Sequence, residues 1–240
     1  MDRWTARNSQ DYEAPAALAV DVVVLTVRAG ALSVLLVRRE DGAWALPGGF
    51  VGVGEAPVHT VARKLAEKTG VQVTHGGRTS SSAGGAPPYL EQLATFADPG
   101  RDPRGWIPSV AHLALVPGDL EPPEPNAAWA PARGRRRWAF DHLAILTAAL
   151  ERLGGKLWWS NVAVGVLPGP FVMSEARVVY EAIAAMRYDP ATFSRDLRAT
   201  GLLEPTGERR REGRGRPAQL YRFRSHTAAW GVGRRKRVAV

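Results

Sequence analysis

The sequence predicts an α+β protein with two domains. The first is an α/β/α sandwich around a mixed sheet, and the second combines helices with a β-hairpin. Three observations support this prediction. The 240 residues exceed one average domain, and β-branched runs alternate with amphipathic helical patterns in the first two thirds of the chain. Residues 193–240 contain thirteen Lys or Arg against four acidic residues, a surplus of nine that equals the net charge of the whole chain. Such asymmetry is typical of a segment that binds a polyanion, most often nucleic acid.

From these patterns we expect a polar tail over residues 1–13, a first domain over 14–153, a second, nucleic-acid-binding domain over 154–224 and a basic tail over 225–240. The chain contains no cysteine, which excludes a disulfide framework and a cysteine-bound zinc finger. No apolar run reaches the length of a membrane span, and residues 1–10 are too polar for a signal peptide. We therefore expect a cytoplasmic, nucleoid-associated protein with no membrane partner.

The first domain opens with two strands. Ala19 to Val27 is a β-branched run suited to a buried strand, and a turn at Ala29-Gly30 leads into a second apolar strand over Leu32 to Arg38. Arg38 and Arg39 end that strand just before a glycine-rich loop. They are placed to meet an anionic ligand, although a solvated strand end explains either one equally well.

A tight loop followed by a helix comes next. Pro47, Gly48 and Gly49 allow the backbone to approach a phosphate closely, and Thr60 to Lys68 predicts a helix with Val61 and Leu65 turned inward. Positions 63, 64, 67 and 68 are three or four residues apart, so the pattern places them on one face of this helix.

The stretch from Ala45 to Val71 resembles a Nudix box, G-x5-E-x7-R-E-U-x-E-E-x-G-U. The matching positions are Gly49, Glu55, Arg63, Leu65, Glu67, Gly70 and Val71. In that family the helix face presents Glu residues to Mg²⁺, which activates water and neutralises a diphosphate. Here Lys64 and Lys68 stand where the pattern has Glu, and an ammonium group cannot bind a cation. The resemblance therefore implies a disarmed site that needs no cofactor and binds Mg²⁺ only weakly.

Two interpretations of these lysines stay open. Lys64 and Lys68 could form a cradle that holds the diphosphate of an ADP-ribose-like ligand without cutting it. They could instead be solvated helix lysines on a site that binds nothing, since exposed ion pairs at this spacing contribute little.

The middle of the chain continues the sandwich. Strands are predicted over Val71–Thr74, Tyr89–Phe96 and Ala111–Val116, with a loop at 75–88 and a proline-rich crossing at 117–131. The resemblance to ADP-ribose-type Nudix domains implies that Glu91, Arg101 and Arg104 lie near the nucleotide.

Residues 140–153 have the apolar spacing of an amphipathic helix that ends at Gly154-Gly155. The five histidines have no partners at metal-ligand spacing, and the chain has no Ser-centred nucleophile motif.

The last part of the chain predicts a helix-turn-helix. A short apolar segment at 161–167 precedes a helix that starts at Ser174-Glu175. This helix is expected to carry one apolar stripe, made of Val178, Val179, Ala182, Ile183 and Met186. Asp189-Pro190 then opens a second helix over 191–200 that stops at Gly201, because Asp is a strong N-cap and Pro suits the first helical position. Phe193 and Leu197 face inward, and the positions left outward include Thr192, Ser194, Arg195 and Arg198.

A basic hairpin follows the second helix. Residues 202–206 and 218–223 can pair, and the tip at 207–217 carries Arg209, Arg210, Arg211, Arg214 and Arg216. Two helices and such a hairpin make a winged helix-turn-helix, whose second helix enters the DNA major groove while the wing follows the backbone or the minor groove. The run G-R-G-R-P also resembles the minor-groove AT-hook motif. A flexible basic loop without groove preference is the other interpretation.

The whole arrangement resembles the Nudix-related transcriptional regulators, the NrtR family, from Ala14 to Phe223. The motifs that carry it are F-D-H, F-V-M-S-E, F-S-R-D-L-R-A-T-G-L-L-E-P-T-G and G-R-G-R-P-A-Q-L-Y-R-F. The resemblance implies a homodimeric repressor of NAD or pentose metabolism genes that binds a double-stranded DNA operator and senses ADP-ribose. Thr192, Ser194 and Asp196 depart from the family's commonest recognition helix, which leaves the operator sequence open.

Two other function classes remain. One is an active Mg²⁺-dependent ADP-ribose or nucleotide diphosphatase that keeps Glu55 and Glu67 as metal ligands and uses the basic domain for nucleic-acid binding. The other is a non-specific nucleic-acid-binding protein. Lys64 and Lys68 argue against the first, and the ordered wing sequence argues against the second.

Overall fold

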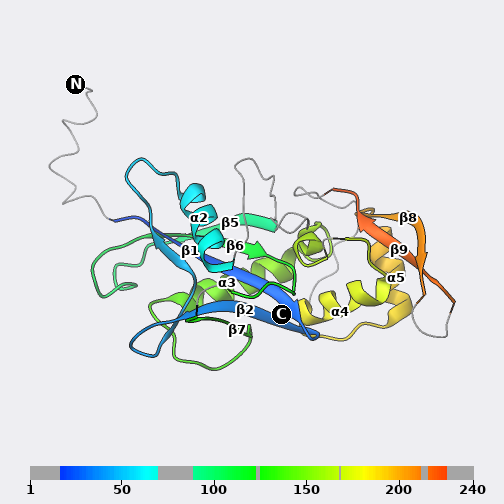
Figure 1. Cartoon of the computed structure of the whole chain (residues 1–240), viewed down its shortest axis with the longest axis horizontal. Coiled ribbons are helices and arrows are strands. Elements are labelled where there is room, and N and C mark those ends of the chain that lie inside the picture. The colour runs from blue at the N-terminus through cyan, green and yellow to red at the C-terminus, as the bar shows by residue number, and fades with distance from the viewer. Residues whose placement is uncertain (1–16, 70–88, 123–124, 168, 212–215, 226–240) are drawn as a thin grey trace, which may run out of the picture.

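The computed structural model describes residues 17–69, 89–122, 125–167, 169–211 and 216–225. The molecule is elongated, with a sheet and its covering helices at one end and a group of helices with a β-hairpin at the other (Figure 1). This order of an α/β/α unit followed by helices and a wing confirms the predicted fold class.

Seven strands of the described residues form one mixed sheet. The central strand β1 (Ala19–Arg28) pairs antiparallel with β2 (Ala31–Arg38) and parallel with β6 (Ser109–Leu115). The remaining strands extend these pairings: β3 (Trp44–Ala45), β4 (Gly48–Phe50), β5 (Tyr89–Phe96) and β7 (Ala127–Pro131). The turn between β1 and β2 has positive φ at Ala29 (47°) and Gly30 (74°), which matches the tight hairpin expected there.

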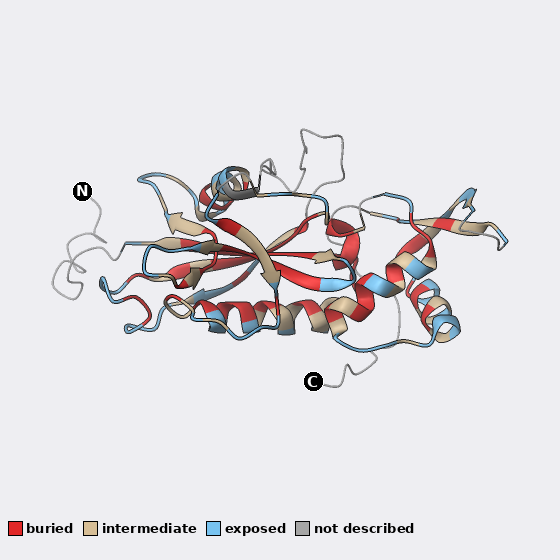
Figure 2. Ribbon diagram, turned by 60° about the horizontal axis from the view of Figure 1, so that its bottom comes forward, coloured by how far each residue is buried: buried red, intermediate tan, exposed pale blue. Residues whose placement is uncertain are grey.

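Helices cover both faces of this sheet because its strands are apolar on both sides. Val20, Val22 and Val24 share one core with the inner face of α2 (Pro57–Thr69). Val23 and Leu25 lie in a second core with α3 (His142–Lys156). Figure 2 shows the buried strands running between the helices, as expected of a sheet whose alternate side chains are covered on both faces.

Two expectations for this domain were wrong. The helix α3 does not stop at Gly154 but continues to Lys156, because Leu153 and Leu157 are fully buried and their packing outweighs the glycine preference. The proline-rich crossing contains strand β7, which pairs with β2 from Ser33↔Pro131 to Val37↔Ala127. The strand expected at 71–74 and the loop at 75–88 lie outside the described residues.

The C-terminal part is a winged helix. It consists of a 3₁₀ turn η1 (Val162–Gly165), helices α4 (Met173–Ala184) and α5 (Pro190–Ala199), and the hairpin of β8 (Leu203–Arg210) with β9 (Ala218–Phe223). The side chain of Asp189 accepts a hydrogen bond from Thr192 N at 2.8 Å, which confirms the predicted helix cap. Strand β8 extends to Arg210, so the tip of the wing is shorter than the sequence suggested.

One side of α4 differs from the expected apolar stripe. Val178 and Met186 are exposed, whereas Ala176, Tyr180 and Ile183 are buried. The stripe is displaced because α4 packs between α3, α5 and the β1–β2 hairpin rather than against one surface.

A single apolar core joins the two ends of the molecule. It runs from Leu25 on the sheet through Leu153 on α3 to Phe193 on α5. At its far end Trp158 contacts Tyr180, Tyr188 and Phe193 edge-on, with ring centroids 5.3–5.7 Å apart. The winged helix is therefore packed on the sandwich and not suspended from a linker. No helix among the described residues is long and apolar enough to cross a membrane.

Candidate functional site

A cavity of about 350 Å³ opens at the end of the sheet where β4 leaves β1. It lies between the first turns of α3, the helix α2 and the loop that carries Arg101 and Arg104. Six of the predicted ligand residues line it: Arg39, Gly48, Gly49, Lys64, Arg101 and Arg104. The other lining residues are Ala19, Asp21, Val37, Ala45, Leu46, Pro47, Phe50, Asp102, Phe140 and His142.

The glycine loop passes close to its neighbours at this cavity. A Cβ on Gly48 would lie 2.4 Å from the Val20 carbonyl oxygen, and one on Gly49 would lie 2.7 Å from the Lys64 Cε atom. Gly48 therefore excludes any larger residue, because its neighbour is backbone, whereas a side chain at Gly49 would require the flexible Lys64 side chain to move. The close approach expected of this loop is confirmed, and it brings Lys64 directly against the loop.

A buried polar network forms the floor of the cavity. The Leu46 N–H donates to His142 Nδ1 at 2.8 Å, so Nδ1 is the acceptor and the proton of the neutral ring sits on Nε2. That Nε2 lies 3.3 Å from Asp21 Oδ1. Asp21 also accepts from Ser109 Oγ at 2.7 Å. The histidine is thus held in one tautomer between the glycine loop and the carboxylate.

Arg101 ties this floor together from the inside. Its Nη2 atom donates to Asp21 Oδ2 at 3.2 Å and to Asp141 Oδ1 at 2.7 Å, and its Nη1 atom donates to the Ile107 carbonyl at 2.9 Å. Only 3% of its side chain is exposed. Burial alone would raise the pKa of Asp21, but hydrogen bonds from His142 and Ser109 and the charge of Arg101 lower it overall. Arg101 therefore holds the floor, and its donors are largely used within the protein.

The mouth of the cavity alternates guanidinium groups with aromatic rings. Arg39 lies 4.9 Å from the ring centre of Phe140, and Arg104 lies 5.3 Å from Phe140 and 5.2 Å from Phe50. Phe50 is 47% exposed, and Phe140 has φ of 53°, which is uncommon for a bulky residue. Strained residues collect at ligand sites, and this mouth offers both charge and flat apolar surface to an incoming molecule.

The residues at the metal-binding positions of the Nudix box form ion pairs within the protein. Arg63 Nη2 lies 2.8 Å from Glu55 Oε2, and Lys64 Nζ lies 2.7 Å from Glu67 Oε2. Hydrogen bonds from Arg63, Thr60 and the Gly52 N–H lower the pKa of Glu55 to about 2. Both retained carboxylates are already neutralised by cations, so this donor set does not fit Mg²⁺. Among the described residues no group of three or more His, Asp or Glu is placed to hold a metal ion.

Three predicted ligand residues are not seen at this cavity. Arg38, the last residue of β2, does not line the cavity and lies 5.3 Å from the ring centre of Trp44. Arg39 follows it directly and takes the cavity side, because consecutive residues of an extended segment project to opposite sides. Glu91 forms an ion pair with Lys156 on the inner side of α3. Lys68 lies in the last turn of α2, but its side chain is outside the described part of the structure.

The sequence did not point to Asp21, Asp141 or His142 as site residues. Asp21 had one usable signal, since it is a lone acid in the apolar run A-V-D-V-V-V and a buried acid requires a partner. Its partner Arg101 lies 80 residues away, and no local pattern specifies that pairing.

A basic surface occupies the opposite end of the molecule. On α5, Arg195 and Arg198 are exposed, and each also bonds within its helix, Arg195 to Asp196 at 3.1 Å and Arg198 Nε to the Ser194 carbonyl at 2.9 Å. Thr192 and Ser194 are half-buried. On the wing, Arg209, Arg211 and Arg216 are exposed, Arg210 pairs with Glu175 at 2.6 Å, and Arg214 lies outside the described residues. The basic side chains of helix and wing suit contacts to a phosphate backbone.

Comparison with known protein families identifies one domain family in each part of the chain. The NUDIX domain family matches residues 15–142, and the NrtR DNA-binding winged helix domain family matches residues 163–223. The chain is 33% identical to the ADPR responsive transcriptional repressor NtrR of Acinetobacter baylyi over 227 residues, which cover 89% of this chain and 84% of that protein.

Two further relatives bear on the site. The crystal structure of Shewanella oneidensis NrtR complexed with a 27mer DNA superimposes with a TM-score of 0.69 and 34% identity, covering 86% of this chain and 93% of that chain. The ADP-ribose pyrophosphatase of Methanocaldococcus jannaschii is 30% identical over 120 residues, which cover 47% of this chain and 63% of that protein.

Proposed function

Because this chain belongs to the NrtR family, we propose that it is a transcriptional repressor that binds duplex DNA through its winged helix and leaves the DNA when ADP-ribose occupies the cavity. The A. baylyi relative is named as ADPR responsive, and the S. oneidensis relative was crystallised on DNA. Both matches extend over most of this chain, so the effector domain and the DNA-binding domain are compared together.

The observation that carries the proposal is the position of Lys64. This residue lines the cavity and is ion-paired with Glu67, at a site where the Nudix box has a metal-binding Glu. An ammonium group has three donors, and its bond to Glu67 leaves others for a diphosphate oxygen. Lys64 thus supplies the positive charge that Mg²⁺ supplies in a hydrolase, without activating a water molecule. The site binds the diphosphate and leaves it intact.

The mouth of the cavity suits the remainder of the ligand. Arg39 and Arg104 add positive charge, and the exposed ring of Phe50 offers a flat surface for an adenine base. Arg101 acts indirectly, because it fixes Asp21 and Asp141 under the ligand.

The helix α3 connects the two functional ends. It begins at His142 in the cavity and spans 15 residues, roughly 22 Å, to its last turn at Lys156. Directly beyond that turn, Trp158 contacts the aromatic core of the winged helix. A homodimer would present two α5 helices to half-sites about 10 base pairs or a multiple apart, so a small shift of each winged helix would break the match to DNA.

A hydrolase is the second candidate, because the chain shares 120 aligned residues with an ADP-ribose pyrophosphatase and keeps Glu55 and Glu67. The ion pairs of those two carboxylates with Arg63 and Lys64 disfavour it.

One experiment separates the candidates. Duplex DNA that the protein itself selects from a random pool is bound, ADP-ribose is added with or without Mg²⁺, and complex and nucleotide are followed in the same tube. We expect the complex to dissociate while ADP-ribose stays intact. Rapid cleavage of ADP-ribose with no effect on the complex would identify a hydrolase instead.

A further inference from the structure

Arg133 reaches from the sandwich to the winged helix. It lies between β7 and α3, and its Nη2 atom donates to the Ile183 carbonyl at 2.7 Å while Nη1 donates to the Ala182 carbonyl at 3.3 Å. Both carbonyls belong to the last turn of α4, which ends at Ala184. The last carbonyls of a helix have no partner within it and carry partial negative charge, so a guanidinium is well matched to them.

This cation has no acidic partner within the part of the chain that the structure describes. Among the described residues no carboxylate lies within ion-pair distance of Arg133, and burial lowers its pKa, although an arginine stays protonated. The two carbonyls of α4 are thus its polar partners in the structure. Arg133 as a whole is exposed, so a displacement of α4 would exchange its two hydrogen bonds to carbonyls for bonds to water. Arg133 therefore favours the present position of that helix through these directed, charge-assisted hydrogen bonds and not through burial of its charge.

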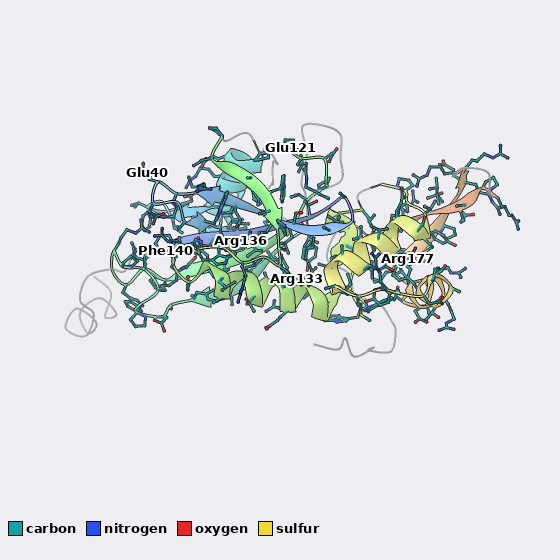
Figure 3. The ribbon with its side chains drawn as sticks, turned by 90° about the horizontal axis from the view of Figure 1, so that it is seen from below. Glu40, Glu121, Arg133, Arg136, Phe140 and Arg177 are labelled. Carbon is teal, nitrogen blue, oxygen red and sulfur yellow. The ribbon has the colours of Figure 1, made fainter. Side chains whose placement is uncertain are left out.

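The segment that carries Arg133 runs directly into the cavity. It is fastened to the sheet by Ala132 N to the Leu32 carbonyl and by Trp44 N to the Arg137 carbonyl, both at 2.9 Å. It then reaches Phe140 at the mouth of the cavity. In Figure 3, Phe140, Arg136 and Arg133 follow one another from the cavity end toward α4, where Arg177 is labelled.

The other side of α4 contacts the helix that reads DNA. Tyr180 on α4 and Phe193 on α5 meet edge-on with ring centroids 5.3 Å apart, and both side chains are almost fully buried. Packed aromatic rings of this kind move together, because a gap between them would forfeit their contacts. A shift of α4 therefore carries α5 with it.

We propose that Arg133 is a positioning residue that couples the cavity to the DNA-reading helix by clamping the C-terminal end of α4. This inference rests on the proposed function. When a ligand displaces Phe140 and the segment behind it, Arg133 moves the end of α4, and α5 leaves its position on the DNA.

The test measures the coupling factor, which is the dissociation constant for the selected duplex with saturating ADP-ribose divided by that without it. The variants are Arg133→Ala and Arg133→Lys. The matched control is Arg135→Ala, which removes the same charge from a neighbour that is likewise exposed and that forms no hydrogen bond or ion pair with α4 among the described residues. ADP-ribose affinity without DNA and the melting temperature are measured for each.

We expect the coupling factor of Arg133→Ala to fall about three- to tenfold, or to one if the wild-type factor is smaller, because a hydrogen bond that competes with water contributes a factor of roughly 2 to 10. The coupling factor of Arg133→Lys should lie between those of the wild type and Arg133→Ala, since an ammonium group cannot donate two parallel hydrogen bonds as a guanidinium does. ADP-ribose affinity without DNA should be unchanged, and Arg135→Ala should behave as wild type.

Three results would overturn the inference. An unchanged factor in both Arg133 variants would exclude coupling. Equal weakening of DNA binding with and without ADP-ribose would make Arg133 merely structural. A wild-type protein that ignores ADP-ribose would refute the proposed function and the clamp together. If Arg133→Ala does not fold, the Lys variant decides: a lowered factor supports the clamp, and a wild-type factor refutes it.

Discussion

Replacing Arg101 tests whether this residue stabilises the floor of the cavity through its ion pairs or only contacts a bound ligand. In Arg101→Ala, the carboxylates of Asp21 and Asp141 lose their shared cation, although Asp21 keeps its bonds to Ser109 and His142. The Arg101 side chain is 3% exposed and that of Asp21 10%. Removing one partner of a buried ion pair costs about 3–5 kcal/mol. We expect the lower end, about 3 kcal/mol, because Asp21 remains partly satisfied.

The assay is urea unfolding followed by circular dichroism, with Arg39→Ala as the control. Arg39 also lines the cavity, but its side chain is 42% exposed and its ion pair with Asp41 is long at 3.7 Å, so its loss should cost less than about 1 kcal/mol. That variant should weaken ADP-ribose binding instead.

The pKa of Asp21 is lower in the folded protein than in the unfolded chain. Ionised Asp21 therefore stabilises the fold at pH values above the ordinary aspartate pKa, and this stabilisation is lost as the pH falls toward the lowered pKa. The cost of Arg101→Ala should therefore shrink below about pH 4.

An Arg101→Ala variant as stable as Arg39→Ala would refute this account of the cavity floor. So would a destabilisation that is independent of pH between neutral and acidic conditions, because it would show that lost packing and not the carboxylates causes the effect.

Three more predictions concern other parts of the molecule. Hydrogen bonds from Tyr188 N–H and Arg187 lower the pKa of Glu181 to about 2, so Glu181→Gln should be less stable at pH 7, and the difference should shrink as the pH falls from about 4.5 toward 2, as measured by unfolding across that range. Lys64→Ala with Lys68→Ala should weaken ADP-ribose binding at least about tenfold by calorimetry, and unchanged affinity would exclude the lysine cradle. Arg211→Ala should weaken DNA binding on all sequences and reduce the salt slope by about one, which a titration at several salt concentrations checks.

The sequence was most informative where a local rule decides the structure. The Ala29-Gly30 turn, the Asp189 cap and the inward side chains of α5 all follow from short-range preferences, and the structure confirms each. The alternation of side chains along an extended segment also separates Arg38, the last residue of β2, from Arg39, which follows it directly, although the sequence suggested the same role for both.

Contacts between residues far apart in the chain decide the features that no local sequence pattern predicts. The continuation of α3 through Gly154 depends on burial of Leu157 against residues distant in the chain. The pairing of Arg101 with Asp21 joins positions 80 residues apart. Strand β7 depends on hydrogen bonds to β2, which lies about 90 residues earlier in the chain and pairs with it antiparallel. The clamp of Arg133 on α4 is of the same kind, since nothing near position 133 in the sequence indicates a helix end 50 residues later.

The measurement that tests the central claim most directly is the affinity of the protein for ADP-ribose with and without the selected DNA duplex, by calorimetry. Coupling between two sites is reciprocal, so DNA must weaken ADP-ribose binding by the same factor by which ADP-ribose weakens DNA binding. We predict equal factors, with the nucleotide recovered intact after the titration. Equal ADP-ribose affinity in the presence and absence of DNA would show that the cavity and the winged helix work independently, and the proposed repressor mechanism would be wrong.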